Sequence, residues 1–183
     1  MRRRRPRADR FDAVPARHRK PADPAAALLT AYAASARINQ YLVEHLAPAI
    51  WRVTPPGGGK RTIAALVAHL HNCGLRYVER TDPQGVPGEL DRARVTPAQA
   101  ARALGAKGRA VVRIVGAALA DGSRIVGFPH DAAHYLAYYM SHDAHHRGQI
   151  VQLARQLGRP ISQATMIGMW QWPRRAEELS ARP

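Results

Sequence analysis

Two histidines on one periodic segment have the spacing of a metal-binding pair. His142 and His146 lie four residues apart in the sequence SHDAHHRGQI. In an α-helix this spacing places them about 40° apart and one turn along the axis, so that two imidazoles can bind the same ion. Tyr135, Leu153 and Leu157 project to the same side of that helix. We therefore expect the pair to face the interior of a helical bundle rather than solvent.

A third ligand has to come from another segment, and VAHLHNC offers two histidines. His69 and His71 lie about 200° apart on a helix, so only one of them can face a shared site. His69 shares its side with Ala65, Leu66 and Cys73, which form an apolar sector, and His71 lies opposite. We therefore expect His69 to complete a three-histidine site with the pair.

Three neutral imidazoles with an open fourth position are typical of a divalent metal that activates water or a bound substrate. The ligand type favours zinc, with nickel, iron or manganese as alternatives. The alternative is a structural role, in which these histidines are buried core residues without a metal. Cys73 is either a fourth ligand or a small buried side chain.

Other polar residues near these positions have open roles. Gln149 projects toward the pair, and Asn39 lies on the inward side of an earlier segment. Either could hydrogen-bond a ligand imidazole, although Asn39 could equally bond another helix. His145 and His134 could serve as a general base or simply be surface histidines. No catalytic residue and no cofactor-binding residue is assigned.

Four periodic segments would position these side chains. We expect helices over about 25–47, 62–80, 97–120 and 130–157. Thr62 and Thr96 are candidate N-caps, while Gly158 ends the last of these helices. No alternating strand pattern is present, so the prediction is an all-α four-helix bundle over residues 25–160. Residues 161–183 read as an irregular tail that packs on the bundle or on a dimer surface.

The net charge of +15 is concentrated near the N-terminus. Residues 1–20 hold nine Arg and Lys against two Asp, so the remaining 163 residues carry +8. We expect residues 1–24 to be a basic, disordered arm, with nucleic-acid contact through residues 1–20 as the alternative. The single cysteine excludes a disulfide framework within the chain and suits a cytoplasmic location. No stretch has the length of a membrane span.

The same residues carry a family resemblance. HDAHHRGQI at 142–150 resembles the DinB/YfiT-like metalloprotein signature H-E-x-H-H-R-G-Q-I, with Asp143 where Glu is frequent. TIAALVAHL at 62–70 resembles the segment that carries the family's first histidine ligand. Tyr32 and the LGRPIS…W tail also fit, so the resemblance covers about 25–172. The sequence departs from the pattern in its basic arm and in lacking a tryptophan after the tyrosine.

The resemblance implies a four-helix bundle of up-down-down-up topology, commonly a homodimer, with a metal on His69, His142 and His146. It also implies possible chemistries, because relatives include metal-dependent transferases of low-molecular-weight thiols such as bacillithiol or mycothiol. We therefore expect a metal-dependent thiol S-transferase acting on electrophiles. The alternatives are a metal-dependent hydrolase and a non-catalytic, metal-stabilised stress or interaction module.

Overall fold

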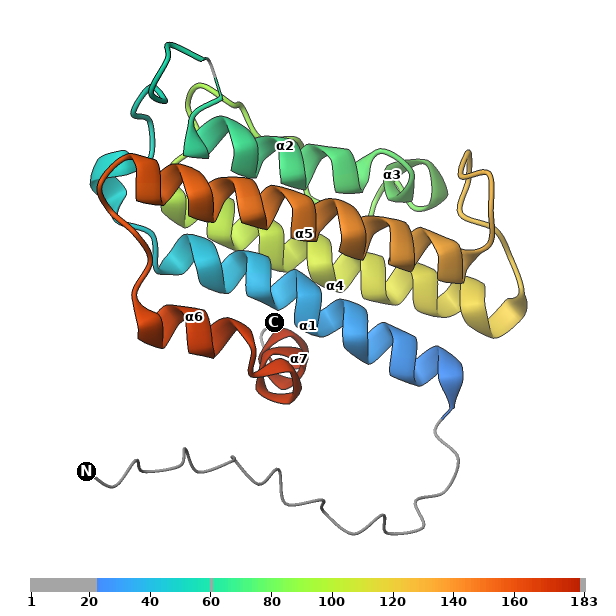
Figure 1. Cartoon of the computed structure of the whole chain (residues 1–183). Coiled ribbons are helices and arrows are strands. Elements are labelled where there is room, and N and C mark those ends of the chain that lie inside the picture. Colours follow the sequence, from blue (N-terminus) through green and yellow to red (C-terminus); the bar gives the residue numbers. More distant parts are fainter. Residues whose placement is uncertain (1–22, 60, 182–183) are drawn as a thin grey trace, which may run out of the picture.

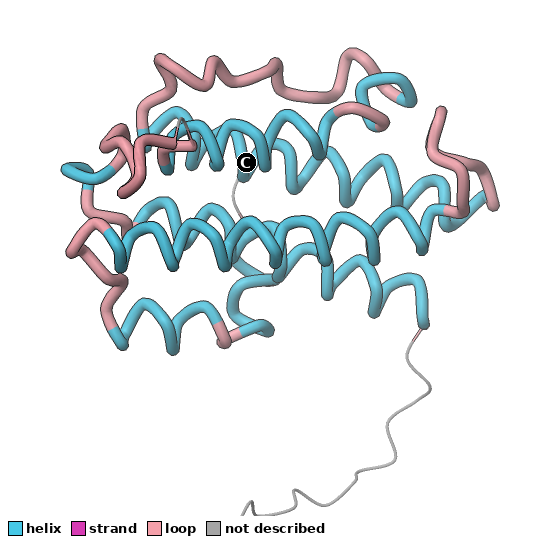
Figure 2. The backbone as a smooth tube through the Cα atoms, turned by 45° about the horizontal axis from the view of Figure 1, so that its top comes forward, coloured by secondary structure: helices cyan, strands magenta, loops and turns pink. Residues whose placement is uncertain are grey.

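The computed structural model describes residues 23–59 and 61–181. Every regular element in this part of the chain is a helix, and it contains no strand (Figure 2). The all-α prediction is therefore confirmed. The basic arm lies almost entirely outside the described residues. None of the described helices has the length and hydrophobicity required to cross a membrane.

Four long helices lie side by side in the molecule (Figure 1). They are α1 (Pro24–Glu44), α2 (Ile63–Leu75), α4 (Pro97–Asp121) and α5 (Ala132–Gln156). Two short helices, η1 (Pro48–Ile50) and α3 (Val78–Thr81), lie in the connections. Both α1 and α2 contact α4 as well as α5, so each of the two covers the α4–α5 pair from its own side.

Local capping explains where the long helices begin. The hydroxyl of Thr62 accepts a hydrogen bond from the Ala65 amide at 3.2 Å, and Thr96 forms a capping box with Gln99. Both predicted caps are confirmed. Helix α1 begins one residue earlier than expected, at Pro24, because the Asp23 carboxylate caps it.

The second helix is shorter than the sequence predicts. Helicity was expected to continue to Arg80, but α2 ends at Leu75 and only the short α3 follows. The last carbonyls of a helix need partners other than its own amides. Here the Tyr135 hydroxyl donates to the Gly74 carbonyl at 3.1 Å, and the Tyr139 hydroxyl donates to the Cys73 carbonyl at 2.8 Å. These donors come from α5 and allow α2 to end inside the core.

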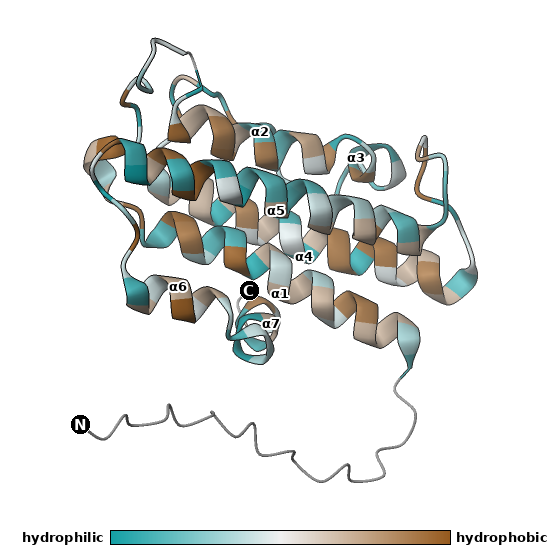
Figure 3. Ribbon diagram, viewed as in Figure 1, coloured by the Kyte–Doolittle hydropathy of each residue, from teal (hydrophilic) through white to brown (hydrophobic). Residues whose placement is uncertain are grey.

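A polar layer divides the core into two apolar clusters. One cluster takes α1, α4 and α5 residues such as Tyr32, Val111 and Leu136; the other takes Leu42, Leu104 and Ile150 from the same helices. The intervening positions hold the buried polar residues Asn39, Lys107 and Asp143. Figure 3 shows the corresponding hydrophilic stretch along the middle of α5. The layer occupies the level of the helices at which the histidines lie.

The segment after residue 160 is more regular than the sequence suggests. It contains α6 (Gln163–Met169) and α7 (Trp172–Ser180) where an irregular tail was expected. The Ser162 hydroxyl caps α6 by accepting from the Thr165 amide at 3.1 Å, and Pro173 lies in the first turn of α7. Both signals are present in the sequence, but these helices are too short to show a clear period.

Helix α7 packs on α1 through a buried charge network. Arg37 of α1 is 3% exposed and lies 2.9 Å from Glu44 and 3.0 Å from Glu178 of α7. Arg175 lies 2.8 Å from the same Glu178 and stacks over the Tyr41 ring at 4.3 Å. The tail is therefore part of the folded unit, and it supplies one of the two acidic partners of a buried arginine on α1.

Candidate metal centre

Three imidazoles from two helices converge at the polar layer. His69 of α2 lies with its ring centroid 5.5 Å from that of His142 and 4.7 Å from that of His146. The two α5 histidines are 4.5 Å apart. One nitrogen from each ring lies within 4.8 Å of the others. The structure thus brings together the three histidines that the sequence analysis selected.

The donor set fits a divalent transition metal. Ligand nitrogens at about 2.0–2.1 Å in tetrahedral geometry are about 3.3 Å apart, so small side-chain rotations would close the remaining gap. His146 is buried, whereas His69 and His142 are partly exposed. Three neutral nitrogens that meet at a half-open position leave room for a further ligand.

Gln149 fixes the orientation of one of these rings. The Gln149 side-chain oxygen accepts from His146 Nδ1 at 2.8 Å, and its amide nitrogen donates to His145 Nε2 at 2.9 Å. His146 therefore carries its proton on Nδ1 and keeps the Nε2 lone pair free. The predicted contact between Gln149 and a candidate ligand is confirmed. His145 is exposed and accepts this hydrogen bond from the Gln149 amide.

A buried carboxylate fixes the second ring. His142 Nδ1 donates to Asp143 Oδ1 at 3.3 Å, which again leaves Nε2 free. Asp143 accepts from Asn39 Nδ2 at 2.6 Å and lies 3.8 Å from Lys107 Nζ. Lys107 in turn donates to the Leu70 carbonyl at 3.0 Å. Helices α1 and α4 thus hold the carboxylate that orients His142, and α2 holds Lys107 in place.

The charges around Asp143 keep it ionised. Burial by itself would raise the pKa of this carboxyl, but Lys107, the hydrogen bond from His142 and the charge of Arg147 together lower it below its usual value. Arg147 acts from the far side, because its guanidinium donates to Asn39 Oδ1 at 2.7 Å. Both Asn39 and Arg147 therefore support the carboxylate rather than the ion itself.

His69 and His146 are biased toward the neutral form that binds metals. Burial lowers the pKa of His69, and the neighbouring His146 and His142 lower it further. Burial also lowers the pKa of His146, against the opposing effect of its bond to Gln149. A metal ligand has to give up its proton before it binds, so this bias favours coordination.

His71 lies on the opposite side of α2, as expected, but that side is not solvent. Its side chain is 0% exposed, whereas His69 is partly exposed. His71 Nε2 donates to the Gly88 carbonyl at 3.0 Å, and burial lowers its pKa to about 4. His69 is the histidine of α2 that converges with the pair, but burial does not distinguish it from His71, because both faces of α2 are covered.

Cys73 lies beside the candidate site and is not fully buried. Its Sγ lies 3.7 Å from both ring nitrogens of His69, one turn along α2. The residue is partly exposed and is a free thiol. Cys73 is therefore not a fully buried small side chain of the core, and it lies close enough to His69 to interact with the site.

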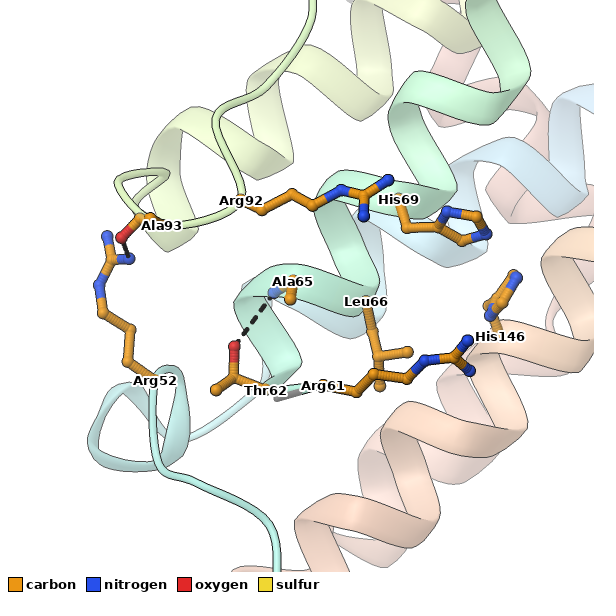
Figure 4. A pocket seen from close by; sticks show the side chains of 9 residues that line it. All are labelled: Arg52, Arg61, Thr62, Ala65, Leu66, His69, Arg92, Ala93 and His146. Atoms are coloured by element: carbon orange, nitrogen blue, oxygen red, sulfur yellow. Dashed lines mark hydrogen bonds between the residues drawn. The ribbon is translucent and has the colours of Figure 1, made fainter. Parts of the chain in front are cut away.

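A cavity of about 670 Å³ opens on the imidazoles (Figure 4). His69 and His146 form part of its wall, and Thr62, Ala65 and Leu66 of the α2 region form another part. Ala93 and three arginines complete the lining, and the arginines are Arg52, Arg61 and Arg92. The volume is that of a pocket for a small molecule.

One of these arginines has a structural role. The Arg52 guanidinium donates to the carbonyls of Ala93, Arg94 and Val95, the last at 2.7 Å. Trp51 Nε1 donates to the same Val95 carbonyl at 2.8 Å. From the other side, Asn72 exchanges two hydrogen bonds with the Leu90 backbone at 2.9 and 3.1 Å. The segment 88–95 is thereby clamped against α2 and against the 51–52 turn.

Sequence reasoning missed the residues that surround the three histidines. The sequence analysis noted Asp143 only as a variation in a motif and gave no role to Lys107. A single lysine in a helical pattern does not predict a buried ion pair with a residue 36 positions later. Arg61 and Arg92 also received no role, because arginine is abundant throughout this chain. A basic residue next to a predicted cap was the only available signal for Arg61.

Comparison with known families agrees with this geometry. The family model described as "DinB family" matches residues 21–176. Neither the comparison with curated proteins nor the comparison with solved structures finds a match.

Proposed function

Because the chain belongs to the DinB family, we propose that it binds a divalent metal through His69, His142 and His146. The convergence of three imidazoles from α2 and α5 carries this proposal. The hydrogen bonds that His142 and His146 donate from Nδ1 support it, because they leave the Nε2 lone pair of each ring available to a metal. The proposal takes the four long helices as the up-down-down-up bundle of the family, and zinc as the first metal to test.

We further propose that the protein is a metal-dependent enzyme of the thiol S-transferase type that acts on electrophiles. The cavity beside His69 and His146 supports this, because a purely structural site is closed. A divalent cation held there would favour the thiolate form of a low-molecular-weight thiol near neutral pH. The residues of this chain would hold the ion, keep His142 and His146 in one tautomer, and enclose the reacting partners.

A metal-dependent hydrolase is the close alternative, because it needs the same open position. The non-catalytic alternative has an observation of its own, namely the contact between Cys73 and His69. A cysteine that closed the coordination sphere would leave no position for a substrate. The location in the cytoplasm, the homodimer and any nucleic-acid contact of residues 1–20 stay predictions.

Metal content tests the first proposal. Purified wild type should hold one divalent ion per chain, and His142→Ala should lose most of it. His134→Ala is the matched control, since His134 lies on the same helix, is exposed and bonds to Asp131 at 2.9 Å. Full occupancy in His142→Ala would remove the basis of the proposal.

Turnover tests the second proposal. The metal-loaded chain is supplied with several thiols and one carbon electrophile, and thiol adducts are measured. We expect adduct formation that stops on metal removal, with Cys73→Ser close to wild type. Hydrolysis of ester or amide substrates without a thiol would favour the hydrolase. Stoichiometric metal with no turnover, and loss of metal in Cys73→Ser, would favour the non-catalytic module.

A further inference from the structure

We propose that Arg61 and Arg92 form an oxyanion-binding subsite, so that the molecule that reacts at the three histidines carries a carboxylate or phosphate group. This inference deepens the proposed function and names a class of substrate or co-substrate. It rests on the side chains around the cavity, which lie outside the family's histidine motif.

Each of the two arginines extends across the cavity toward a different imidazole. In Figure 4 the Arg92 side chain extends alongside His69, and the Arg61 side chain extends toward His146. Arg61 precedes the cap of α2, and Arg92 lies on the clamped segment 88–95. A small molecule in this cavity would therefore meet both guanidinium groups close to the point where the histidines converge.

Neither of these guanidinium groups has a partner within residues 23–59 and 61–181. Arg52, the third arginine of the cavity, does have partners, because its guanidinium donates hydrogen bonds to backbone carbonyls. No acidic residue lines this cavity in the described part of the chain. Glu79 and Glu89 line the adjacent cavity with Arg92, yet no ion pair joins either of them to it. Two fork-shaped donors face the cavity without a counter-charge.

The chemistry of guanidinium selects the class of ligand. Arginine presents several N–H donors in a planar fork that matches the two oxygens of a carboxylate or phosphate. Leu66 and Ala65 on the same wall offer a short apolar surface between the two arginines. The cavity thus fits a compact anion with a carbon backbone, one end at the histidines and the charged end at the arginines.

The position of Arg92 adds to the argument. Arg92 lies in the segment 88–95, which contains no helix or strand. Four side chains nevertheless hold the backbone of this segment by hydrogen bonds to Gly88, Leu90 and the carbonyls of residues 93–95. These bonds fix the backbone position from which the exposed Arg92 side chain extends before any ligand arrives. Such pre-organisation lowers the entropic cost of binding an anion.

Calorimetric titration of the full chain at pH 7.5 tests the subsite. The probes are succinate, inorganic phosphate and the uncharged succinamide, each with one equivalent of zinc and again without added zinc. We expect the dianions to bind in both conditions and succinamide not to bind. In Arg61→Gln/Arg92→Gln the affinity for the dianions should fall about tenfold, as expected for two exposed charge pairs.

A charge-matched variant separates the subsite from general attraction to a basic protein. Arg102→Gln/Arg155→Gln removes the same two charges at exposed positions of α4 and α5 and should bind as wild type does. The comparison of succinate with phosphate identifies which oxyanion is preferred. Absence of binding by both dianions, or equal affinity in the two double variants, overturns the inference.

A second measurement distinguishes failure of the subsite from failure of the proposed function. Mercaptosuccinate and 2-mercaptoethanol are titrated into the zinc-loaded chain, since only the first carries carboxylates. Mercaptosuccinate should bind more tightly, and its advantage should vanish in Arg61→Gln/Arg92→Gln while 2-mercaptoethanol is unaffected. Equal binding of both thiols to wild type counts against the subsite alone. Failure of both thiols to bind, with succinate still bound, counts against the thiol chemistry alone.

Discussion

Replacing Asp143 by asparagine should separate metal affinity from stability. The substitution keeps the shape of the side chain but removes the charge that accepts from His142 and faces Lys107. Loss of a carboxylate that orients a metal-ligating histidine typically lowers metal affinity about 10- to 100-fold. Lys107 and Asp143 are both 1% exposed, so the lysine would keep a buried charge without its counter-charge. Breaking a buried pair in this way costs about 3–5 kcal/mol.

Two features of the structure place the expected cost at the lower end of that range. Lys107 Nζ keeps its bond to the Leu70 carbonyl, and its 3.8 Å separation from Asp143 is long for a direct ion pair. We therefore expect Asp143→Asn to lose about 3 kcal/mol in free energy of unfolding. Urea denaturation of the metal-free chain measures this loss, and competition with a chelator measures zinc affinity.

The double variant Lys107→Met/Asp143→Asn provides the control. It removes both charges, so most of the lost stability should return. Zinc affinity should stay low, because His142 still lacks a carboxylate acceptor. Wild-type zinc affinity in the single variant would refute the orienting role of Asp143. A double variant no more stable than the single one would show that Lys107 is not the source of the loss.

Three further predictions concern stability. Burial lowers the pKa of His71 to about 4, so below its usual value of 6.5 the unfolded chain takes up a proton that the folded chain refuses. The contribution of neutral His71 to the free energy of unfolding is fully present above pH 6.5 and is lost as the pH falls toward 4. Between pH 7 and 5 the metal-free wild type should therefore lose about 2 kcal/mol more free energy of unfolding than His71→Gln, measured by urea titration. Equal losses in the two proteins would contradict this. Gly108→Ala should lower the free energy of unfolding by about 1–3 kcal/mol, because the new Cβ would lie 2.9 Å from the Cβ of Ala36. Gly148→Ala should instead raise it by about 1 kcal/mol, since no atom lies within 4 Å of the new Cβ on this exposed turn of α5; thermal unfolding of both variants checks the opposite signs.

Patterns local to one helix were enough to predict much of the fold. In the predicted helix over 97–120, Ala101, Leu104, Gly108 and Ala118 recur at helical spacing, and all four are buried in α4. The caps at Thr62 and Thr96 also depend only on nearby residues. At Gly148 no atom lies within 4 Å of an added Cβ, so no close contact between helices requires a glycine there.

What the sequence could not predict depends on partners far along the chain. The early end of α2 follows from hydroxyl donors on Tyr135 and Tyr139, which lie about 60 residues later. The histidine spacing on α5 predicts two candidate ligands, but the Asn39–Asp143 bond spans 104 positions. No periodicity within one helix encodes such pairs, so the surroundings of the site needed the folded chain.

The clamp on residues 88–95 has a consequence for motion near the candidate site. Amides of this segment, such as that of Leu90, should exchange hydrogen with solvent slowly although they belong to no helix, because Asn72 and Arg52 hold the backbone. The stretch 53–59 is different: it is largely exposed, and Gly57 and Gly58 have positive φ and no neighbour within 4 Å of a Cβ. The backbone that carries Arg92 is therefore held in place beside the cavity, whereas the exposed stretch 53–59 does not line it, so slow exchange is expected only on the Arg92 side.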